Sequence, residues 1–306
     1  MNTINLIGQN LNSIPNEVFT QDGISILWLD KNNLHHIPEE ITLLAKLKIL
    51  SFYKNQFDNL PSILFNLRSL TRINASANNI EVLPEEIGNL DKLEVLDIQH
   101  NKLKSIPPTI GKLKNLIYLY LGGNQLSKLP DSIANLKHLK YLNITYNKFL
   151  QLPESIKYLE NLIELRVYNN NLLSLPEIIG ELVNLKELHA MDNKINCLPE
   201  AIGKLINLRK LIISNNQLER LPDSIGSLIN ITDLDLRTNK LTELPETIGN
   251  LKTLRFLDLR ENRLVKLPDS IQSLSSLEKL DLRLNKELIL PAWLKTLEKR
   301  NCTVFY

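Results

Sequence analysis

The sequence predicts an α/β solenoid, in which short parallel strands form the concave face of a curved horseshoe and short helical or 3₁₀ returns form its convex face. Two observations predict this fold. A proline recurs every 23 residues, and an asparagine recurs with the same period. A fixed period of about 20 to 50 residues is typical of stacked repeats, in which each unit buries its apolar side against its neighbours.

The period runs through almost the whole chain. The prolines in phase are Pro15, Pro38, Pro61, Pro84, Pro107, Pro130, Pro153, Pro176, Pro199, Pro222, Pro245, Pro268 and Pro291. The asparagines in phase run from Asn32 to Asn285, and Gln9 takes that place in the first repeat. The common unit is L-x-x-L-x-L-x-x-N-x-L-x-x-L-P-x-x-I-x-x-L-x-x. We therefore predict thirteen repeats over residues 1–299, followed by a C-terminal cap or edge strand over residues 300–306.

The first part of each unit has the pattern of a short strand. In the sixth repeat, Leu119 and Leu121 alternate with Tyr118 and Tyr120. A period of two places the leucines inside and the tyrosines outside. Asn124 follows, and its amide can satisfy backbone groups that the turn exposes. One such asparagine per repeat predicts a buried ladder.

The second part of each unit returns the chain to the next strand. Pro130 fixes φ and lacks an N–H donor, so it suits the end of the turn. Ile133 and Leu136, three residues apart, indicate a short helical or 3₁₀ segment. A glycine often follows the isoleucine, as at Gly226, where we expect a tight return that tolerates no side chain.

The repeat unit resembles the 23-residue class of leucine-rich repeats, the L-P-x-x-I-x-x-L type found in Ras-binding and Scribble-type scaffolds and in many bacterial repeat proteins. The resemblance covers essentially the whole chain. It implies a scaffold that binds proteins, but it implies no particular partner. The catalytic modules that accompany such repeats in that family need tens to hundreds of further residues, and none remain in this sequence.

Composition and charge narrow the function classes. The net charge of +2 gives no electrostatic reason to expect a nucleic-acid partner. No apolar run reaches the length of a membrane-spanning helix, so we predict no membrane insertion. The first residues, MNTINLIGQNLNSIP, do not have the pattern of a signal peptide. Cys197 and Cys302 are too few for a disulfide framework, and we predict a cytoplasmic location.

The sequence shows no catalytic or metal-binding motif. Its five histidines occur in no HExxH motif and in no cluster with cysteines. Gly122-Gly123 lacks the Gly-Lys-Ser/Thr that completes a phosphate-binding loop. Cys302 has no histidine near it in the sequence, and a cap residue is the simpler interpretation. We therefore predict a non-enzymatic protein with no cofactor and no metal.

Outward positions of the predicted strands favour two binding surfaces. The first is largely aromatic, and its rings have no evident duty in the core. Tyr and Met are enriched at the centres of protein interfaces, although half-exposed strands also favour aromatics. Its predicted members are Tyr118, Tyr120, Tyr141, Tyr146, Arg166, Tyr168, His189 and Met191.

The second predicted surface is charged. It consists of aspartates in one column, each followed two residues later by an arginine: Asp235, Arg237, Asp258, Arg260, Asp281 and Arg283. Such a ladder either neutralises itself, as exposed pairs that contribute little to stability, or interleaves with the charges of a partner. The sequence leaves both interpretations open.

The predicted function is that of a protein-interaction scaffold whose partner, of unknown identity, binds on the concave face. The alternative is a bacterial effector, or the substrate-recognition fragment of a larger enzyme such as a ubiquitin ligase. An effector of this kind would be delivered into a host cell.

Overall fold

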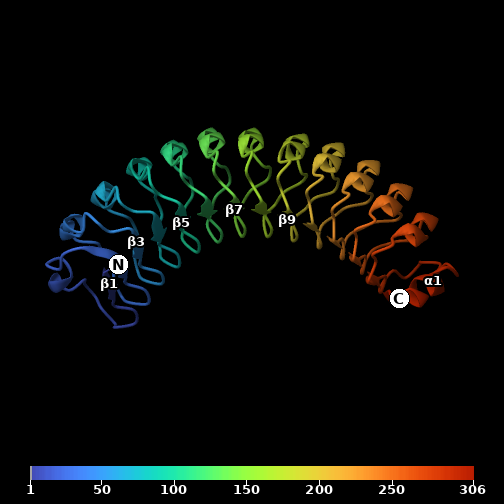
Figure 1. Ribbon diagram of the computed structural model, residues 1–306, viewed down its shortest axis with the longest axis horizontal. Coiled ribbons are helices and arrows are strands. Elements are labelled where there is room, and N and C mark those ends of the chain that lie inside the picture. The colour runs from blue at the N-terminus through green and yellow to red at the C-terminus, as the bar shows by residue number, and fades with distance from the viewer. Residues whose placement is uncertain (1) are drawn as a thin grey trace. The chain divides into compact units, whose positions relative to one another are not determined.

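The computed structural model describes residues 2–306, which divide into two compact units, residues 2–148 and residues 149–306. In each unit the strands line the inner side of a curve and the 3₁₀ turns line its outer side (Figure 1). The predicted class, an α/β repeat solenoid with a parallel sheet and short 3₁₀ returns, is confirmed. The one α-helix in the described part of the chain, α1, spans Leu294–Lys299.

The first unit alternates strands with 3₁₀ turns. Its strands are β1 (Asn2–Asn5), β2 (Ile24–Trp28), β3 (Ile49–Ser51), β4 (Arg72–Asn74), β5 (Val95–Asp97), β6 (Tyr118–Tyr120) and β7 (Tyr141–Asn143). Its turns are η1 (Asn16–Val18), η2 (Glu39–Leu43), η3 (Ser62–Asn66), η4 (Glu85–Asn89), η5 (Pro108–Lys112) and η6 (Asp131–Asn135).

The second unit repeats this alternation and contains α1 before its last strand. Its strands are β8 (Glu164–Arg166), β9 (Glu187–His189), β10 (Lys210–Ile212), β11 (Asp233–Asp235), β12 (Phe256–Asp258), β13 (Lys279–Asp281) and β14 (Thr303–Phe305). Its turns are η7 (Glu154–Tyr158), η8 (Glu177–Glu181), η9 (Glu200–Lys204), η10 (Asp223–Ser227), η11 (Glu246–Asn250) and η12 (Asp269–Ser273).

The strands pair in parallel with the register of the repeat. Val95 of β5 pairs with Tyr118 of β6, and Tyr118 pairs with Tyr141 of β7. In the second unit Asp235 pairs with Asp258 in the same way. Each repeat position therefore becomes a column that crosses the sheet of its unit, and residues in one column are neighbours in space. At the C-terminal end, Asp281 of β13 pairs with Phe305 of β14.

The core lies between the strands and the 3₁₀ turns. Its leucines and isoleucines are almost completely buried, as the repeat pattern predicts. In the first unit Phe52 and Ala75 occupy the same interior position of adjacent repeats, and both are fully buried. The ring of Phe52 also meets that of Phe57 edge to face, with centroids 4.9 Å apart. A large side chain beside a small one keeps the packing dense without a change in the repeat.

The asparagines form a buried ladder. Nδ2 of Asn124 donates to the carbonyls of Leu121, at 3.0 Å, and of Ile98 in the preceding repeat, at 2.9 Å. Its Oδ1 accepts the backbone N–H of Leu103 at 3.0 Å. Asn216 repeats the arrangement in the second unit. One side chain thus closes its own turn and ties it to the preceding repeat, which satisfies polar groups that burial would otherwise penalise.

The residue before each asparagine of the ladder has a left-handed backbone, which the repeat pattern alone does not predict. Examples are Lys54 with φ 54°, Thr238 with φ 53° and Tyr146 with φ 51°. Glycine fits this conformation best, yet in the described part of the chain Gly123 is the only glycine among the residues that precede the ladder asparagines. The hydrogen bonds of the asparagine ladder hold the other residues there.

The glycine that follows the isoleucine is favoured for a different reason from the one expected. Gly226 does not have a positive φ, so the turn itself does not require it. A Cβ at this position would lie 2.4 Å from the carbonyl oxygen of Thr247, in the next 3₁₀ turn. The glycine therefore allows neighbouring turns to pack closely and is not needed for a tight return.

Candidate functional site

Each three-residue strand of the repeats presents its first and third residues to the inner side of its unit, and the residue two positions after the third lies in the next column. We call this surface the strand-lined face. In β6, Tyr118 and Tyr120 lie on it, whereas Leu119 between them is fully buried. Side chains on this face are not required to fill the core.

Three of the predicted tyrosines come together in the first unit. The ring centroids of Tyr120 and Tyr141 are 4.8 Å apart, and Tyr118 lies 6.5 Å from Tyr120 and 6.4 Å from Tyr141. We call these three residues the tyrosine cluster. Such spacing is typical of aromatic rings in contact, and it joins a large apolar area to hydroxyl groups at the surface.

The other aromatic predictions lie elsewhere on the repeats. Tyr146 is not an outward strand residue, because it occupies the left-handed position of its turn, where it is exposed. Tyr168 and Met191 follow the ends of β8 and β9 and are half-buried. These two residues and His189 belong to the second unit. A single continuous aromatic patch across both groups stays a prediction.

A hollow of about 510 Å³ adjoins the tyrosine cluster. It is lined by Arg72, Ile73, Asn74, Val95, Asp97, Tyr118 and Tyr120. Asp97 lies at the end of β5, and its Oδ1 accepts the backbone N–H of Gln99 at 3.1 Å. Burial raises the pKa of Asp97, although the hydrogen bonds from Gln99 and the charge of His100 oppose this shift. Asp97 was not among the predicted site residues, although it occupies the same repeat position as Asp235.

Arg166 and His189 are part of a charged cluster on β8, β9 and β10. Nε of Arg166 lies 2.5 Å from Oε1 of Glu164, and Nε2 of His189 lies 3.0 Å from Oε2 of Glu187. Lys210 completes the cluster, with Nζ 3.1 Å from Oε1 of Glu187. Neither glutamate nor the lysine was among the predicted site residues, although their outward strand positions could have identified them.

The charges of this cluster compensate one another. Burial would raise the pKa of Glu187, but the hydrogen bonds from His189 and Lys210 outweigh it and lower the pKa. Donor atoms of Glu164, Glu187 and His189 all lie within 4.8 Å of one another, close enough to hold a metal ion. Both carboxylates, however, already pair with Arg166 or Lys210, so a metal would have to displace these cations. The arrangement favours a self-neutralised surface.

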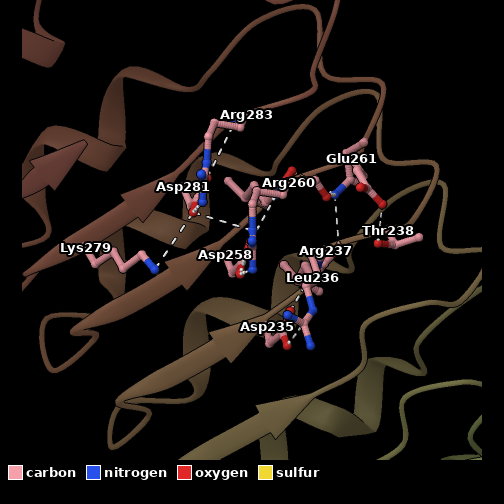
Figure 2. Close-up of polar contacts among 12 residues, drawn as sticks. Asp235, Leu236, Arg237, Thr238, Asp258, Arg260, Glu261, Lys279, Asp281 and Arg283 are labelled. Carbon is pink, nitrogen blue, oxygen red and sulfur yellow. Dashed lines mark hydrogen bonds and ion pairs between the residues drawn. The ribbon is translucent and has the colours of Figure 1, made fainter. Parts of the chain in front are cut away.

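The predicted Asp/Arg ladder forms on β11, β12 and β13, and Figure 2 shows its contacts. Arg260 donates to Asp258 through Nε and Nη2, with the shortest contact 2.6 Å, and its Nε also lies 3.5 Å from Asp281 of the next strand. Arg283 pairs with Asp281 at 2.6 Å. Arg237 pairs more loosely with Asp235, at 3.4 Å.

Burial distinguishes the aspartates of the ladder. The side chain of Asp281 is fully buried, so the expectation that the ladder consists of exposed pairs is wrong at this residue. Burial would raise the pKa of Asp281, but the hydrogen bonds from Arg283 and the charge of Arg260 lower it overall. Asp235 behaves in the opposite way: burial and the nearby charge of Asp258 raise its pKa, despite the opposing effect of Arg237.

A second hollow, of about 600 Å³, adjoins the ladder. It is lined by Arg237, Thr238, Arg260, Glu261, Arg283, Leu284 and Tyr306. Tyr306 lies outside the repeats, and nothing in the periodic pattern indicates that it lines a hollow with the three arginines. Thr238 and Glu261 are joined by a hydrogen bond of 2.8 Å. This end of the second unit therefore presents a surface of mixed charge whose charged side chains are paired within the chain.

Burial of Cys302 bears on whether its thiol is reactive, and helix length bears on whether the chain could cross a membrane. Cys302 is buried, and burial raises the pKa of its thiol, which keeps it in the unreactive protonated form. Within residues 2–306, no helix combines the length and the apolar character needed to cross a bilayer.

The similarity of this chain to known proteins lies in its repeats. No curated protein matches the chain significantly. A leucine-rich-repeat protein of Leptospira interrogans is 31% identical, with a TM-score of 0.68, over 99% of this chain and 95% of that one. The Arabidopsis receptor kinase HAESA, solved with the peptide hormone IDA and the co-receptor SERK1, is 26% identical with a TM-score of 0.76.

The extent of these matches differs. The alignment with HAESA covers 99% of this chain but 57% of that chain, so this chain spans little more than half of the receptor structure. An internalin of Listeria monocytogenes has a TM-score of 0.83 at 22% identity, over 99% of this chain and 86% of that one, and shows the fold alone. A family model described as a leucine-rich repeat region matches residues 74–137, 116–220 and 215–299. The chain therefore belongs to the leucine-rich-repeat proteins.

Proposed function

We propose that the chain is a non-enzymatic protein-interaction module that binds a protein partner on its strand-lined face. The observation that carries the proposal is the tyrosine cluster, in which three rings lie together on a surface that the core does not need. Tyrosines supply large, rigid contact area at low entropic cost, and they are frequent at the energetic centres of interfaces.

The charged groups of the face support the same function. The Asp/Arg ladder and the cluster around His189 hold fixed charges of both signs. Fixed charges contribute to the choice and register of a partner more than to its affinity. Related structures agree with this use of the fold, since HAESA is solved with a peptide hormone and a co-receptor. The mixed signs also favour a protein over nucleic acid, which would require a basic surface.

The test is an affinity capture of partners with the intact chain, followed by a binding measurement on each partner that mass spectrometry identifies. Replacing Tyr118 and Tyr141 together by alanine should weaken binding at least tenfold, because truncation of a central interface residue costs about 2 kcal/mol or more. Tyr158→Ala is the matched control, since Tyr158 is an exposed tyrosine on the 3₁₀ turn η7. Equal affinity of the double variant and the intact chain would contradict the proposal.

The cytoplasmic location, and delivery into a host cell in the case of a bacterial effector, stay predictions. Both cysteines, Cys197 and Cys302, are unpaired, which agrees with a reducing compartment.

A further inference from the structure

Asp97, on the strand-lined face of the first unit, is a half-buried carboxylate that forms no ion pair, and the charge of His100 acts on it only from beyond ion-pair distance. Its Oδ1 accepts hydrogen bonds from the backbone N–H of Gln99, at 3.1 Å, and from Nε2 of Gln99, at 3.4 Å. Within the described part of the chain, its Oδ2 accepts no hydrogen bond, and no lysine, arginine or histidine lies at ion-pair distance. A partly buried charge without a counter-charge is costly, and burial accordingly raises the pKa of Asp97.

The second unit shows how the same position is neutralised within the chain. Asp97 is the third residue of its strand, as are Asp258 and Asp281. In those two repeats the residue two positions later is an arginine, whose Nε and Nη2 both donate to the aspartate. At Asp97 the equivalent residue is Gln99, which is neutral. The first unit therefore keeps the carboxylate of this pair and lacks its guanidinium.

Gln99 is fixed in this role by its neighbours. Its Oε1 accepts a hydrogen bond from Nδ2 of Asn143 at 3.0 Å, which directs Nε2 toward Asp97. A Cβ at Gly122 would lie 3.1 Å from Oε1 of Gln99 and 3.1 Å from Oδ1 of Asn143. The glycine thus leaves room for this polar network. One oxygen of Asp97 is held, and the other remains available to a ligand.

The surroundings of the available oxygen suit a cationic side chain with an apolar stem. Tyr118, Tyr120 and Val95 line the hollow of about 510 Å³ together with Asp97. Aromatic faces attract cations, and most often the guanidinium of arginine, while aliphatic stems pack on apolar walls. Arg72, on the neighbouring strand β4, also lines the hollow, but it is exposed and forms no ion pair with Asp97 within the described residues. The carboxylate end is therefore the part that remains without a counter-charge.

We propose that this hollow binds an arginine side chain of the protein partner, whose guanidinium pairs with Asp97 and lies against the ring of Tyr120. The pair reproduces, between two chains, the contact that Arg260 makes with Asp258 in the second unit. Arginine is preferred to lysine because its planar fork can donate two parallel hydrogen bonds to one carboxylate. This inference rests on the proposed function, because it names the chemistry of the partner at the tyrosine cluster.

The test is an NMR titration of the full chain with a blocked peptide, acetyl-Gly-Arg-Gly-amide. The control peptide carries citrulline, which has nearly the same shape as arginine and no charge. We expect saturable shifts of the Asp97 carboxyl and of the tyrosine rings, with about tenfold weaker association of the citrulline peptide. Binding should also lower the pKa of Asp97. No saturable binding, or equal binding of the two peptides, would overturn the proposal.

Three variants separate a specific site from a general effect of charge. Asp97→Asn should weaken the association of the arginine peptide about tenfold. Glu86→Gln removes one negative charge from the exposed turn η4 and should leave it unchanged. Gln99→Arg should place an arginine of the chain itself in the site and abolish binding, while the fold, followed by circular dichroism, is kept. An unchanged association of Asp97→Asn or Gln99→Arg would refute the arginine site.

The proposed function and this inference fail in different ways. If capture of a partner depends on Tyr118 and Tyr141 but not on Asp97, the interaction surface stands and the arginine site is wrong. If the peptide binds at Asp97 but the double tyrosine variant keeps its protein partner, the arginine site stands and the proposed partner surface is wrong.

Discussion

At the residue scale, the buried polar groups of this chain differ in how completely they are satisfied. Asn216 donates to three backbone carbonyls, those of Ala190, Ile213 and Ser214, and accepts one N–H, so both ends of its amide are paired. The side chain of Asp281 is fully buried but is surrounded by arginines. Asp97 has only a neutral partner. The first two residues therefore serve stability, and the third costs stability in the absence of a ligand.

The asparagine ladder predicts a large effect for a small truncation. Asn216→Ala should lower the free energy of unfolding by about 3 kcal/mol, because it leaves buried carbonyl and N–H groups without hydrogen bonds. Asn196→Ala, at an exposed position in the neighbouring loop, should change it by less than about 0.5 kcal/mol. Urea denaturation of both variants measures the difference. A loss below 1 kcal/mol for Asn216→Ala would show that the ladder is not a main support of the repeat, since about 1 kcal/mol is the net value of a single typical hydrogen bond.

The two kinds of aspartate predict opposite responses to neutralisation. The pKa of Asp281 is lowered in the folded state, so its contribution is present above the unfolded pKa of about 3.9 and is lost as the pH falls through its folded pKa. The pKa of Asp97 is raised, so its charge disfavours folding at neutral pH and this cost disappears in acid.

At pH 7, Asp281→Asn should therefore destabilise the chain by about 2 kcal/mol, because it breaks a buried charge network with partly exposed arginines. Asp97→Asn should leave stability unchanged or raise it by up to about 1 kcal/mol. Denaturation at pH 7 and at pH 3 tests both, and the difference between each variant and the intact chain should shrink at the lower pH. A clear loss of stability in Asp97→Asn would assign that residue a structural role.

At the element scale, the repeat pattern predicted the strands and the 3₁₀ turns because each has one apolar residue in a fixed place. It did not predict the left-handed residue before each asparagine, since that position carries Lys, Thr, Tyr or Glu without a common type. The cause of the repeated glycine was also misjudged. The recurring glycine indicates that a side chain is disfavoured at this position, although Ala134 occupies it in η6, and only the stacking of turns shows what a side chain would meet.

The stacking of turns can be tested at Gly226. Gly226→Ala should destabilise the chain by about 2 kcal/mol, because its Cβ would approach the backbone of Thr247 and force neighbouring turns apart. Ala134 occupies the same repeat position in η6, and Ala134→Gly should cost no more than about 1 kcal/mol. Thermal unfolding of both variants decides between the two causes. Unchanged stability of Gly226→Ala would mean that the turns are less tightly packed than the structure shows.

At the scale of the whole molecule, the sequence predicted the fold class almost completely and the candidate surfaces in part. Strict periodicity turns each repeat position into a column, so outward residues such as Tyr118, Tyr120 and Tyr141 could be grouped before the structure was known. The pairing of Arg166 with Glu164 and of Lys210 with Glu187 was not predicted. The full burial of Asp281 and the place of Tyr306 depend on how the last strands pack, where the repeat pattern ends.

The most direct test of the strand-lined face is site-specific photo-cross-linking of the intact chain. A benzophenone amino acid replaces Tyr118 in one sample and Tyr158, on the turn η7, in the other, and both are irradiated with the partner or with a cell extract. The proposed function predicts a discrete cross-linked protein from position 118 and none from position 158. Cross-links from position 158 alone would place binding on the opposite face and contradict the proposed function.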